Sequence, residues 1–176
     1  RYHLSLQHET IEAPLQPFQL ALWLPDPAAP CREAEAAAEV LALGSDAGSR
    51  GAIFTRREVV DFILDLVGYT EDQPLHKKRL LEPSFGGGDF LLPVIARLLS
   101  AWRAARPNGS ALEDLSNAIR AVELHRDTFT ATSRAVVDLL TREGLATESA
   151  SALADCWLAQ GDFLLAPLEG KFDFVV

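Results

Sequence analysis

Short apolar runs alternate with helical patterns from about residue 51 to residue 176, and this order restricts the fold more than any other feature. The runs "RLLEP", "AIRAVEL", "CWLAQGDFLL" and "FDFVV" have the length and composition of strands, and helical patterns precede or separate them. Strands that alternate with helices form a parallel sheet covered by helices, here expected on both faces. The sequence therefore predicts an α/β fold, whose ligands would bind at the carboxyl ends of the strands.

The helix signals are clearest in "FTRREVVDFILDLVG". Thr55 and Glu58 have the spacing of a capping box, Phe54 and Val59 that of a hydrophobic staple, and Gly68 can close the helix. Further helices are expected from about Asp89 to Arg103, from Asp127, as its cap, to about Arg142, and over residues 147–155.

Three consecutive glycines lie inside "LLEPSFGGGDFLL", residues 80–92, between a predicted strand and a predicted helix. Glycine costs about 0.5 to 1 kcal/mol in a regular element, so such a cluster indicates positive φ or close approach to a ligand. Three acids fall at the predicted carboxyl ends of strands, namely Glu82, Glu123 and Asp162. The glycines and these acids are therefore expected to face one crevice.

The pattern around the glycines excludes two common phosphate sites. A dinucleotide site uses Gly-x-Gly-x-x-Gly, but Leu91 occupies the third glycine position, and Glu82 would repel a pyrophosphate. A P-loop needs Gly-Lys-Ser or Gly-Lys-Thr, which does not follow. The ligand should be a nucleoside without phosphates that carries a positive group, and S-adenosylmethionine fits this description.

Composition restricts the partners and the compartment. A net charge of -9 weighs against a broad nucleic-acid surface on this chain alone. The two cysteines, Cys31 and Cys156, lie far apart, and the four histidines have no metal spacing, so we expect no disulfide framework and no metal. No apolar run reaches the roughly 20 residues of a membrane span. These features predict a soluble, cytoplasmic protein without a membrane partner.

Five segments together resemble adenine-N6 DNA methyltransferases of restriction-modification systems. "LLEPSFGGGDFLL" is similar to their first motif, Asp-Pro-x-x-Gly-x-Gly-x-Phe-Leu, and "GAIFTRREVVDFILDLV" to the element before it, although Arg56 replaces a proline. "AVELH" resembles the second motif, "QGDFLL" the third, and "FDFVV" the strand before the fourth. The resemblance covers residues 51–176 and implies a Rossmann-like class I methyltransferase sheet flanked by helices.

The resemblance also implies a role for individual residues toward S-adenosylmethionine. Thr55 would help hold the methionine carboxylate, Glu82 would face the methionine end, and Glu123 would accept the ribose hydroxyls. Asp162 would accept from the adenine amino group, and Phe163 would pack on the ring. The expected cofactor-binding set is Thr55, Glu82, Ser84, Phe85, Gly86, Gly88, Glu123, Leu124, Asp162 and Phe163.

The resemblance assigns no catalytic residue to this chain, because Asn/Asp-Pro-Pro-Tyr/Phe, the motif that would receive the target adenine, does not occur in it. We expect a truncated methyltransferase domain over residues 51–176, inactive by itself, that meets DNA through other parts of the parent protein. Residues 1–50 would form an amino-terminal extension. The alternatives are a methyltransferase for protein, RNA or a small molecule, and a non-catalytic cofactor-binding or scaffold subunit.

Overall fold

The computed structural model of the protein describes residues 55–105 and 108–176, and the expected extension over residues 1–50 and the staple residue Phe54 lie outside this part. The helices are α2 (Arg57–Leu66), the short 3-10 helix η1 (Leu75–Lys77), α3 (Leu91–Ala104), α4 (Ala111–Leu115), α5 (Arg126–Arg142) and α6 (Thr147–Trp157). The strands are β1 (Leu80–Glu82), β2 (Ile119–Glu123), β3 (Leu158–Gln160) and β4 (Phe174–Val175).

The four strands form one parallel sheet in the order β3-β2-β1-β4. Glu82 at the end of β1 is level with Ala121 of β2, and Glu123 at the end of β2 is level with Gln160 of β3. The predicted α/β fold with a parallel sheet flanked by helices is confirmed. Because the strands are parallel, the acids that end β1 and β2 lie at the same edge.

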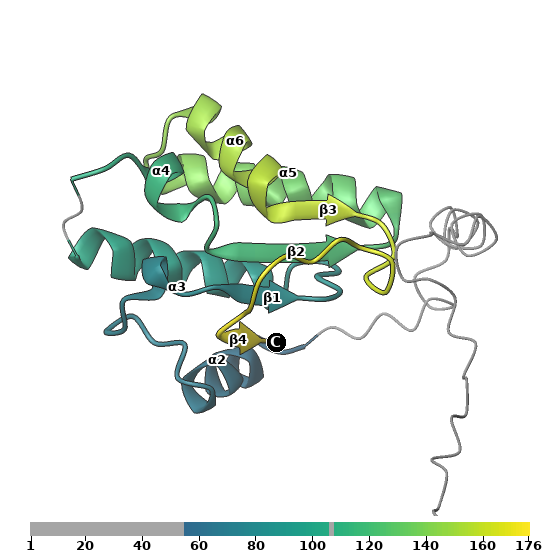
Figure 1. The fold of residues 1–176 in the computed structure, drawn as a ribbon, viewed down its shortest axis with the longest axis horizontal. Coiled ribbons are helices and arrows are strands. Elements are labelled where there is room, and N and C mark those ends of the chain that lie inside the picture. The colour runs from purple at the N-terminus through teal and green to yellow at the C-terminus, as the bar shows by residue number, and fades with distance from the viewer. Residues whose placement is uncertain (1–54, 106–107) are drawn as a thin grey trace, which may run out of the picture.

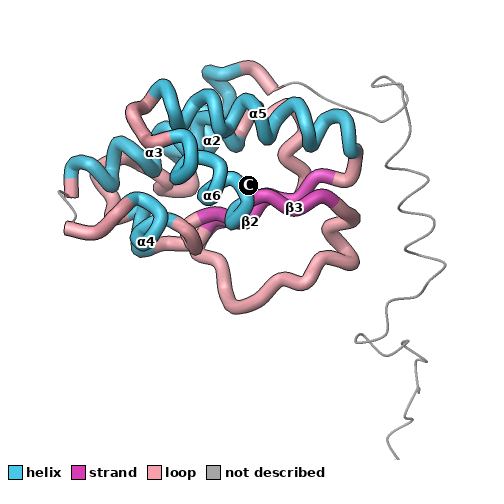
Figure 2. The backbone as a smooth tube through the Cα atoms, turned by 90° about the horizontal axis from the view of Figure 1, so that it is seen from above, coloured by secondary structure: helices cyan, strands magenta, loops and turns pink. Residues whose placement is uncertain are grey.

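The helices of the described residues lie on one side of the sheet, and the connection from β3 to β4 runs on the other (Figures 1 and 2). The expectation of helices on both faces is therefore not met. The crossover connections from β1 to β2 and from β2 to β3 proceed in the same direction across the sheet. Because such connections are right-handed, their helices lie on the same face. The connection over residues 161–173 contains no helix.

The core lies between the sheet and the helices. Strand residues Leu80, Ile119 and Ala121 pack there against the apolar sides of α3, α5 and α6. Leu91, the residue at the third dinucleotide glycine position, is fully buried in this core. The start of α3 is thus fixed by packing.

Two predicted helix caps, Thr55 and Asp127, are wrong, and the helix expected from about Asp89 is found with its start shifted slightly. Helix α2 begins after Arg56 without a side-chain cap, α3 begins two residues beyond Asp89, and His125 rather than Asp127 precedes α5. Asp127 lies in the first turn of α5, where its charge still favours the helix dipole. Capping residues can be read from a sequence only to within a residue or two, because neighbouring polar residues compete for the same role.

The predicted end of α2 is confirmed. Gly68 has φ +79°, and the N–H groups of Gly68 and Tyr69 donate to the carbonyls of Asp65 and Leu64 at 3.0 and 2.8 Å. This is a Schellman arrangement, which needs the left-handed backbone that glycine adopts freely. The strand predicted from Cys156 starts later, at Leu158, because α6 continues through Trp157.

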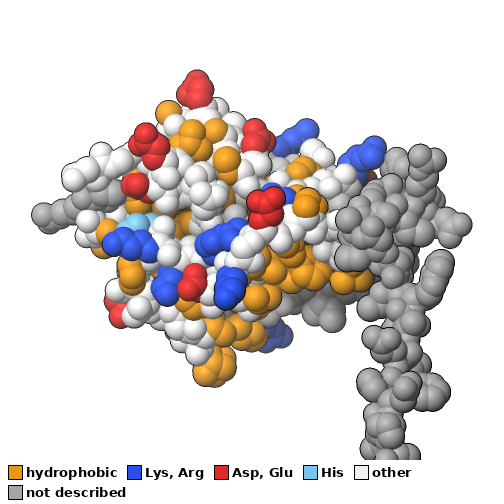
Figure 3. Space-filling model, viewed as in Figure 1, with side chains coloured by type: hydrophobic (Ala, Val, Ile, Leu, Met, Phe, Trp, Pro, Cys, Tyr) orange, Lys and Arg blue, Asp and Glu red, His pale blue; other side chains and the backbone are white. Residues whose placement is uncertain are grey.

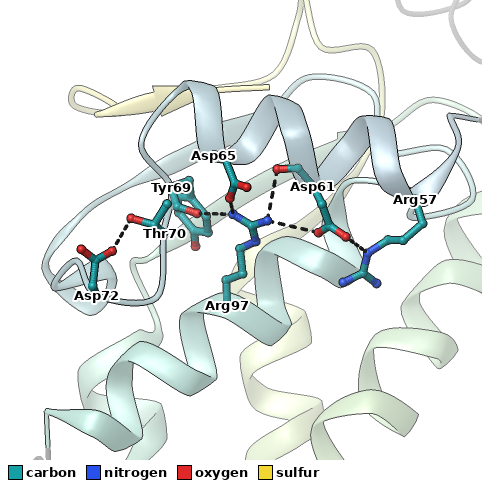
Figure 4. Close-up of polar contacts among 7 residues, drawn as sticks. All are labelled: Arg57, Asp61, Asp65, Tyr69, Thr70, Asp72 and Arg97. Carbon is teal, nitrogen blue, oxygen red and sulfur yellow. Dashed lines mark hydrogen bonds and ion pairs between the residues drawn. The ribbon is translucent and has the colours of Figure 1, made fainter.

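Arg97 of α3 holds α2 in place (Figure 4). Its guanidinium donates to the carboxylates of Asp61 and Asp65 and to the backbone carbonyls of Asp61 and Tyr69. The Arg97 side chain is only 12% exposed, so these bonds are partly shielded from water and are stronger than surface ion pairs. Arg97 thereby fixes α2 and the turn that follows it relative to α3.

The surface outside α2 is apolar. Val59, Phe62 and Leu66 of α2 and Val67 directly after it are 42–74% exposed, and Val175 of β4 is 60% exposed. Figure 3 shows apolar side chains along the lower edge of this face and Lys and Arg side chains toward its middle. Helix α2 therefore buries only Val60 and Leu64 among the described residues.

Trp157 generates a prediction about stability. It is fully buried, and its indole N–H donates to the carbonyl of Leu115 at 2.8 Å, which ties α6 to α4. The variant Trp157→Phe removes this bond and leaves the buried carbonyl with the N–H of Ala118 as its remaining partner, so we expect it to lower the free energy of unfolding by roughly 0.5 to 1.5 kcal/mol. Denaturant unfolding followed by circular dichroism measures the change.

Trp102→Phe is the matched control for this prediction. The Trp102 indole donates to the Asp114 carboxylate at 2.9 Å at a partly buried position, where water can replace the lost donor. We expect a smaller loss of stability for Trp102→Phe than for Trp157→Phe. Equal losses would contradict the assigned role of the Leu115 carbonyl.

Candidate functional site

The carboxyl edge of the sheet brings together the acids that the sequence singled out. Glu82 ends β1 and Glu123 ends β2, and both side chains are buried, at 4% and 3% exposure. Asp162 follows β3 and is half-buried. The N–H of Gly161 donates to the backbone carbonyl of Glu123 at 2.9 Å, so the chain carrying Asp162 leaves from beside Glu123.

The glycine loop, defined here as residues 84–89, has the backbone that its glycines predict. Gly86 has φ +49° and Gly88 has φ +88°, both in the left-handed region. A Cβ at Gly88 would lie 3.1 Å from the methyl carbon of Thr132, whereas a Cβ at Gly86 would meet nothing within 4 Å. Gly88 is therefore required for conformation and packing, and Gly86 leaves its backbone open to a ligand.

Glu123 holds the glycine loop against the end of β2. Its Oε2 accepts the N–H of Gly86 at 2.9 Å, and its Oε1 accepts the N–H of His125 at 2.7 Å. Two charge-assisted bonds offset much of the cost of burying this carboxylate. Each oxygen keeps a second lone pair, so the same carboxylate can still accept from a pair of hydroxyls.

Thr132 of α5 is a site residue that the sequence analysis missed. Its side chain is buried, and its hydroxyl donates to the carbonyl of Gly86 at 2.7 Å. Its position in the sequence could have indicated that it is buried, because Thr132, Val136 and Leu140 follow one another at helical spacing on the buried stripe of α5. A polar residue in such a stripe must find a buried partner.

Asp89 is a second missed residue, and it explains the position of Thr55. The N–H of Thr55 donates to Oδ2 of Asp89 at 2.8 Å, which joins the segment before α2 to the glycine loop. The capping box predicted for Thr55 is wrong, since Arg56 takes the cap position and no side chain caps the helix. Thr55 still reaches the site, although through its backbone.

Burial and two neighbouring acids change the chemistry of Glu82. Loss of solvation, with the negative charges of Asp89 and Glu123 added, raises the pKa of Glu82 to about 8. Its Oε2 is buried and has no hydrogen-bond partner among the described residues. A buried carboxyl with one unpaired oxygen, beside two other acids, attracts a positive group, which would stabilise its ionised form.

The remaining predicted residues are placed as follows. Phe85 is buried, its N–H donates to the carbonyl of Val122 at 3.0 Å, and its ring packs against Phe129. Ser84 is exposed, and Leu124 and Phe163 are half-buried. Oδ1 of Asp162 accepts the N–H of Leu164 at 2.9 Å, which leaves its second oxygen for another donor. Direct contacts thus join Glu123, Gly86 and Thr132, while Asp162 and Phe163 are linked to them through the backbone.

Two negative findings concern the described residues alone. Residues 55–105 and 108–176 contain no group of three or more His, Cys, Asp or Glu side chains that could hold a metal ion. Within the same ranges, no helix has the length and apolar character needed to cross a membrane.

Three curated proteins are similar to this chain. The type II methyltransferase M.PaeR7I of Pseudomonas aeruginosa is 75% identical over 141 residues, M.XhoI of Xanthomonas vasicola is 51% identical over 131, and M.BstVI of Geobacillus stearothermophilus is 39% identical over 132. These alignments cover 80%, 72% and 72% of this chain and 25%, 23% and 23% of the relatives. The chain thus spans about a quarter of the length of its homologues, which are type II methyltransferases.

The chain matches no protein-family model. It also matches no solved structure. The three methyltransferases are therefore the comparisons that bear on function.

The raised pKa of Glu82 predicts how stability depends on pH. Because the pKa in the folded protein, about 8, exceeds the ordinary value of 4.5, the folded state holds this proton more tightly than the unfolded state. The resulting stabilisation is complete below the ordinary value and disappears as the pH rises through about 8. We expect Glu82→Gln to be more stable than the wild type above about pH 8 and to lose this advantage near pH 5.

Melting temperatures measured between about pH 5 and pH 8.5 check this expectation. The control is Glu58→Gln, which changes an exposed acid of α2 and should leave the pH profile as in the wild type. Parallel profiles for the wild type and Glu82→Gln would contradict the assigned protonation of Glu82.

Proposed function

We propose that this chain is the S-adenosylmethionine-binding part of an adenine-N6 DNA methyltransferase of a restriction-modification system. The observation that most supports this is the carboxyl edge of the sheet, where Glu123 accepts the N–H of Gly86 and has lone pairs left, and where the neighbouring Glu82 is buried with its Oε2 unpaired among the described residues. The homology to type II methyltransferases agrees with it. A cytoplasmic location stays a prediction.

The donor set fits the cofactor group by group. Glu82 meets the positive methionine end, and the carboxylate of Glu123 accepts the ribose hydroxyls while it holds Gly86. The free oxygen of Asp162 accepts from the adenine amino group, and Phe163 packs on the ring. Thr55 lies at the methionine end, since its N–H is bonded to Asp89 beside Glu82.

The loop geometry disfavours a phosphate ligand. Three carboxylates, those of Glu82, Asp89 and Glu123, act on one another near the glycine loop. A pyrophosphate would be repelled there, whereas a cofactor with an ammonium and a sulfonium is attracted. The buried Leu91 also blocks the close helix approach that a third glycine permits in dinucleotide sites.

The bound cofactor would supply a methyl group on a sulfonium, ready for in-line transfer to a nucleophile. The residues of this chain bind and orient it, and such positioning provides much of the rate in transfer reactions. We assign the adenine target and its extrusion from DNA to parts of the parent protein outside this chain. The chain alone would then bind cofactor without methylating DNA.

Calorimetry tests the proposal directly. We expect the 176-residue chain to bind S-adenosylmethionine and to give no heat with NAD. Because the cofactor brings a positive group to Glu82, whose pKa is about 8 in the free protein, binding at about pH 7 should release close to one proton. Titrations in two buffers of different ionisation enthalpy measure this release.

Glu82→Gln is the control for the proton release. This variant should bind without releasing a proton, because the amide does not titrate. Binding of NAD without binding of S-adenosylmethionine would overturn the proposed cofactor. Cofactor binding with no proton released by the wild type would instead reject the pairing of Glu82 with the positive group.

The ribose role of Glu123 gives a separate prediction. In the wild type, S-adenosylhomocysteine should bind more tightly than its 2′,3′-dideoxy analogue by roughly 1.5 to 3 kcal/mol for each hydroxyl bonded to the carboxylate. In Glu123→Ala this difference should largely vanish. Because Glu123 also holds the N–H groups of Gly86 and His125, the variant should melt at a lower temperature as well.

The comparison of the two ligands separates these effects. If Glu123 has only a structural role, Glu123→Ala should weaken the binding of both ligands equally and leave the difference between their affinities unchanged. Such a result would reject the ribose contact even if the variant binds weakly.

A further inference from the structure

Thr132 contacts two of the three glycines at once. Its hydroxyl donates to the carbonyl of Gly86 at 2.7 Å, and its methyl carbon lies 3.1 Å from the position that a Cβ at Gly88 would take. The side chain is 3% exposed, so water does not replace either contact. One side chain of α5 therefore restrains both left-handed positions of the loop.

The bond of Thr132 differs from those of other threonines on α5. Thr130 and Thr141 donate to the carbonyls of Arg126 and Val137, four residues earlier in the same helix, at 2.9 and 2.8 Å. Such bonds within a helix are common for threonine. Thr132 instead reaches a carbonyl 46 residues away in sequence, in the glycine loop.

Gly86 is consequently held by side chains on both of its polar backbone groups. Glu123 accepts its N–H, and Thr132 donates to its carbonyl. A run of three glycines loses much conformational freedom when it becomes ordered, and this loss opposes ordering of the loop. When the protein orders the loop before the ligand arrives, the ligand need not meet that cost.

We propose that Thr132 is a positioning residue for cofactor binding, acting by holding the Gly86 carbonyl so that the loop backbone is fixed in its binding conformation. This rests on the proposed function of the site. Thr132 does not itself contact the cofactor, so its effect reaches the ligand only through Gly86 and its neighbours.

Two substitutions separate the hydroxyl from the methyl group. Thr132→Val keeps the shape and removes the donor, and Thr132→Ser keeps the donor and removes the methyl. We expect Thr132→Val to weaken S-adenosylmethionine binding by about five- to tenfold, the usual effect of one lost hydrogen bond, and Thr132→Ser to stay near the wild type. Calorimetry on the 176-residue chain, well below the melting temperature of each variant, measures the affinity.

Thr141→Val is the matched control, because it also removes a threonine hydroxyl bonded to a carbonyl from α5 but lies away from the loop. It should leave the affinity unchanged. Hydrogen exchange at the amides of Gly87 and Gly88 provides a second readout, and it should become faster in Thr132→Val and not in Thr141→Val.

The outcomes distinguish this inference from the proposed function. Wild-type affinity in a folded Thr132→Val, or equal losses in Thr132→Val and Thr132→Ser, would overturn the positioning role. If the wild-type chain binds no S-adenosylmethionine, the proposed function is overturned. If hydrogen exchange at Gly87 and Gly88 is unchanged in Thr132→Val, the inference that Thr132 restrains the loop is overturned, whatever the affinities are.

Discussion

The carboxylate of Glu123 is the contact on which the site depends, because it connects the sheet to the glycine loop. It lies at the last residue of a buried strand and accepts one N–H from the loop and one from the turn before α5. Burying an ionised carboxylate is costly unless it is hydrogen-bonded, and these two bonds supply that condition. The strand end, the glycine loop and the start of α5 are therefore ordered together.

Burial determines the state of Glu82, the neighbouring acid. Loss of solvation, with the negative charges of Asp89 and then Glu123 added, raises the pKa of Glu82, so the residue keeps its proton near neutral pH. Where several acids lie close together and cannot all be charged, the pKa of one of them commonly rises and that residue stays protonated. The site is consequently prepared for a ligand that brings a positive charge.

The sequence alone predicted the parts of the structure that local patterns determine. The strands that end at Glu82 and Glu123 follow from short apolar runs, and the left-handed backbone at Gly86 and Gly88 follows from glycine itself. The contacts of Asp89 with Thr55 and of Thr132 with Gly86 join residues 34 and 46 positions apart. Such contacts depend on how α2 and α5 pack, which no local pattern specifies.

Residues 76–79, "HKKR", form a basic segment just before β1, and they illustrate why charge near a site does not by itself indicate nucleic-acid binding. Lys78 pairs with Asp173, and the guanidinium of Arg79 donates to the carbonyls of Glu169 and Lys171 and stacks on Phe172. Both cations thus hold the segment that leads into β4. Strand β4 pairs with β1, and β1 ends in Glu82. Because these charges are used within the fold and the whole chain carries a net charge of -9, this part of the protein is suited to hold a cationic cofactor. The proposed function accordingly assigns the attraction for DNA phosphates to residues outside this chain.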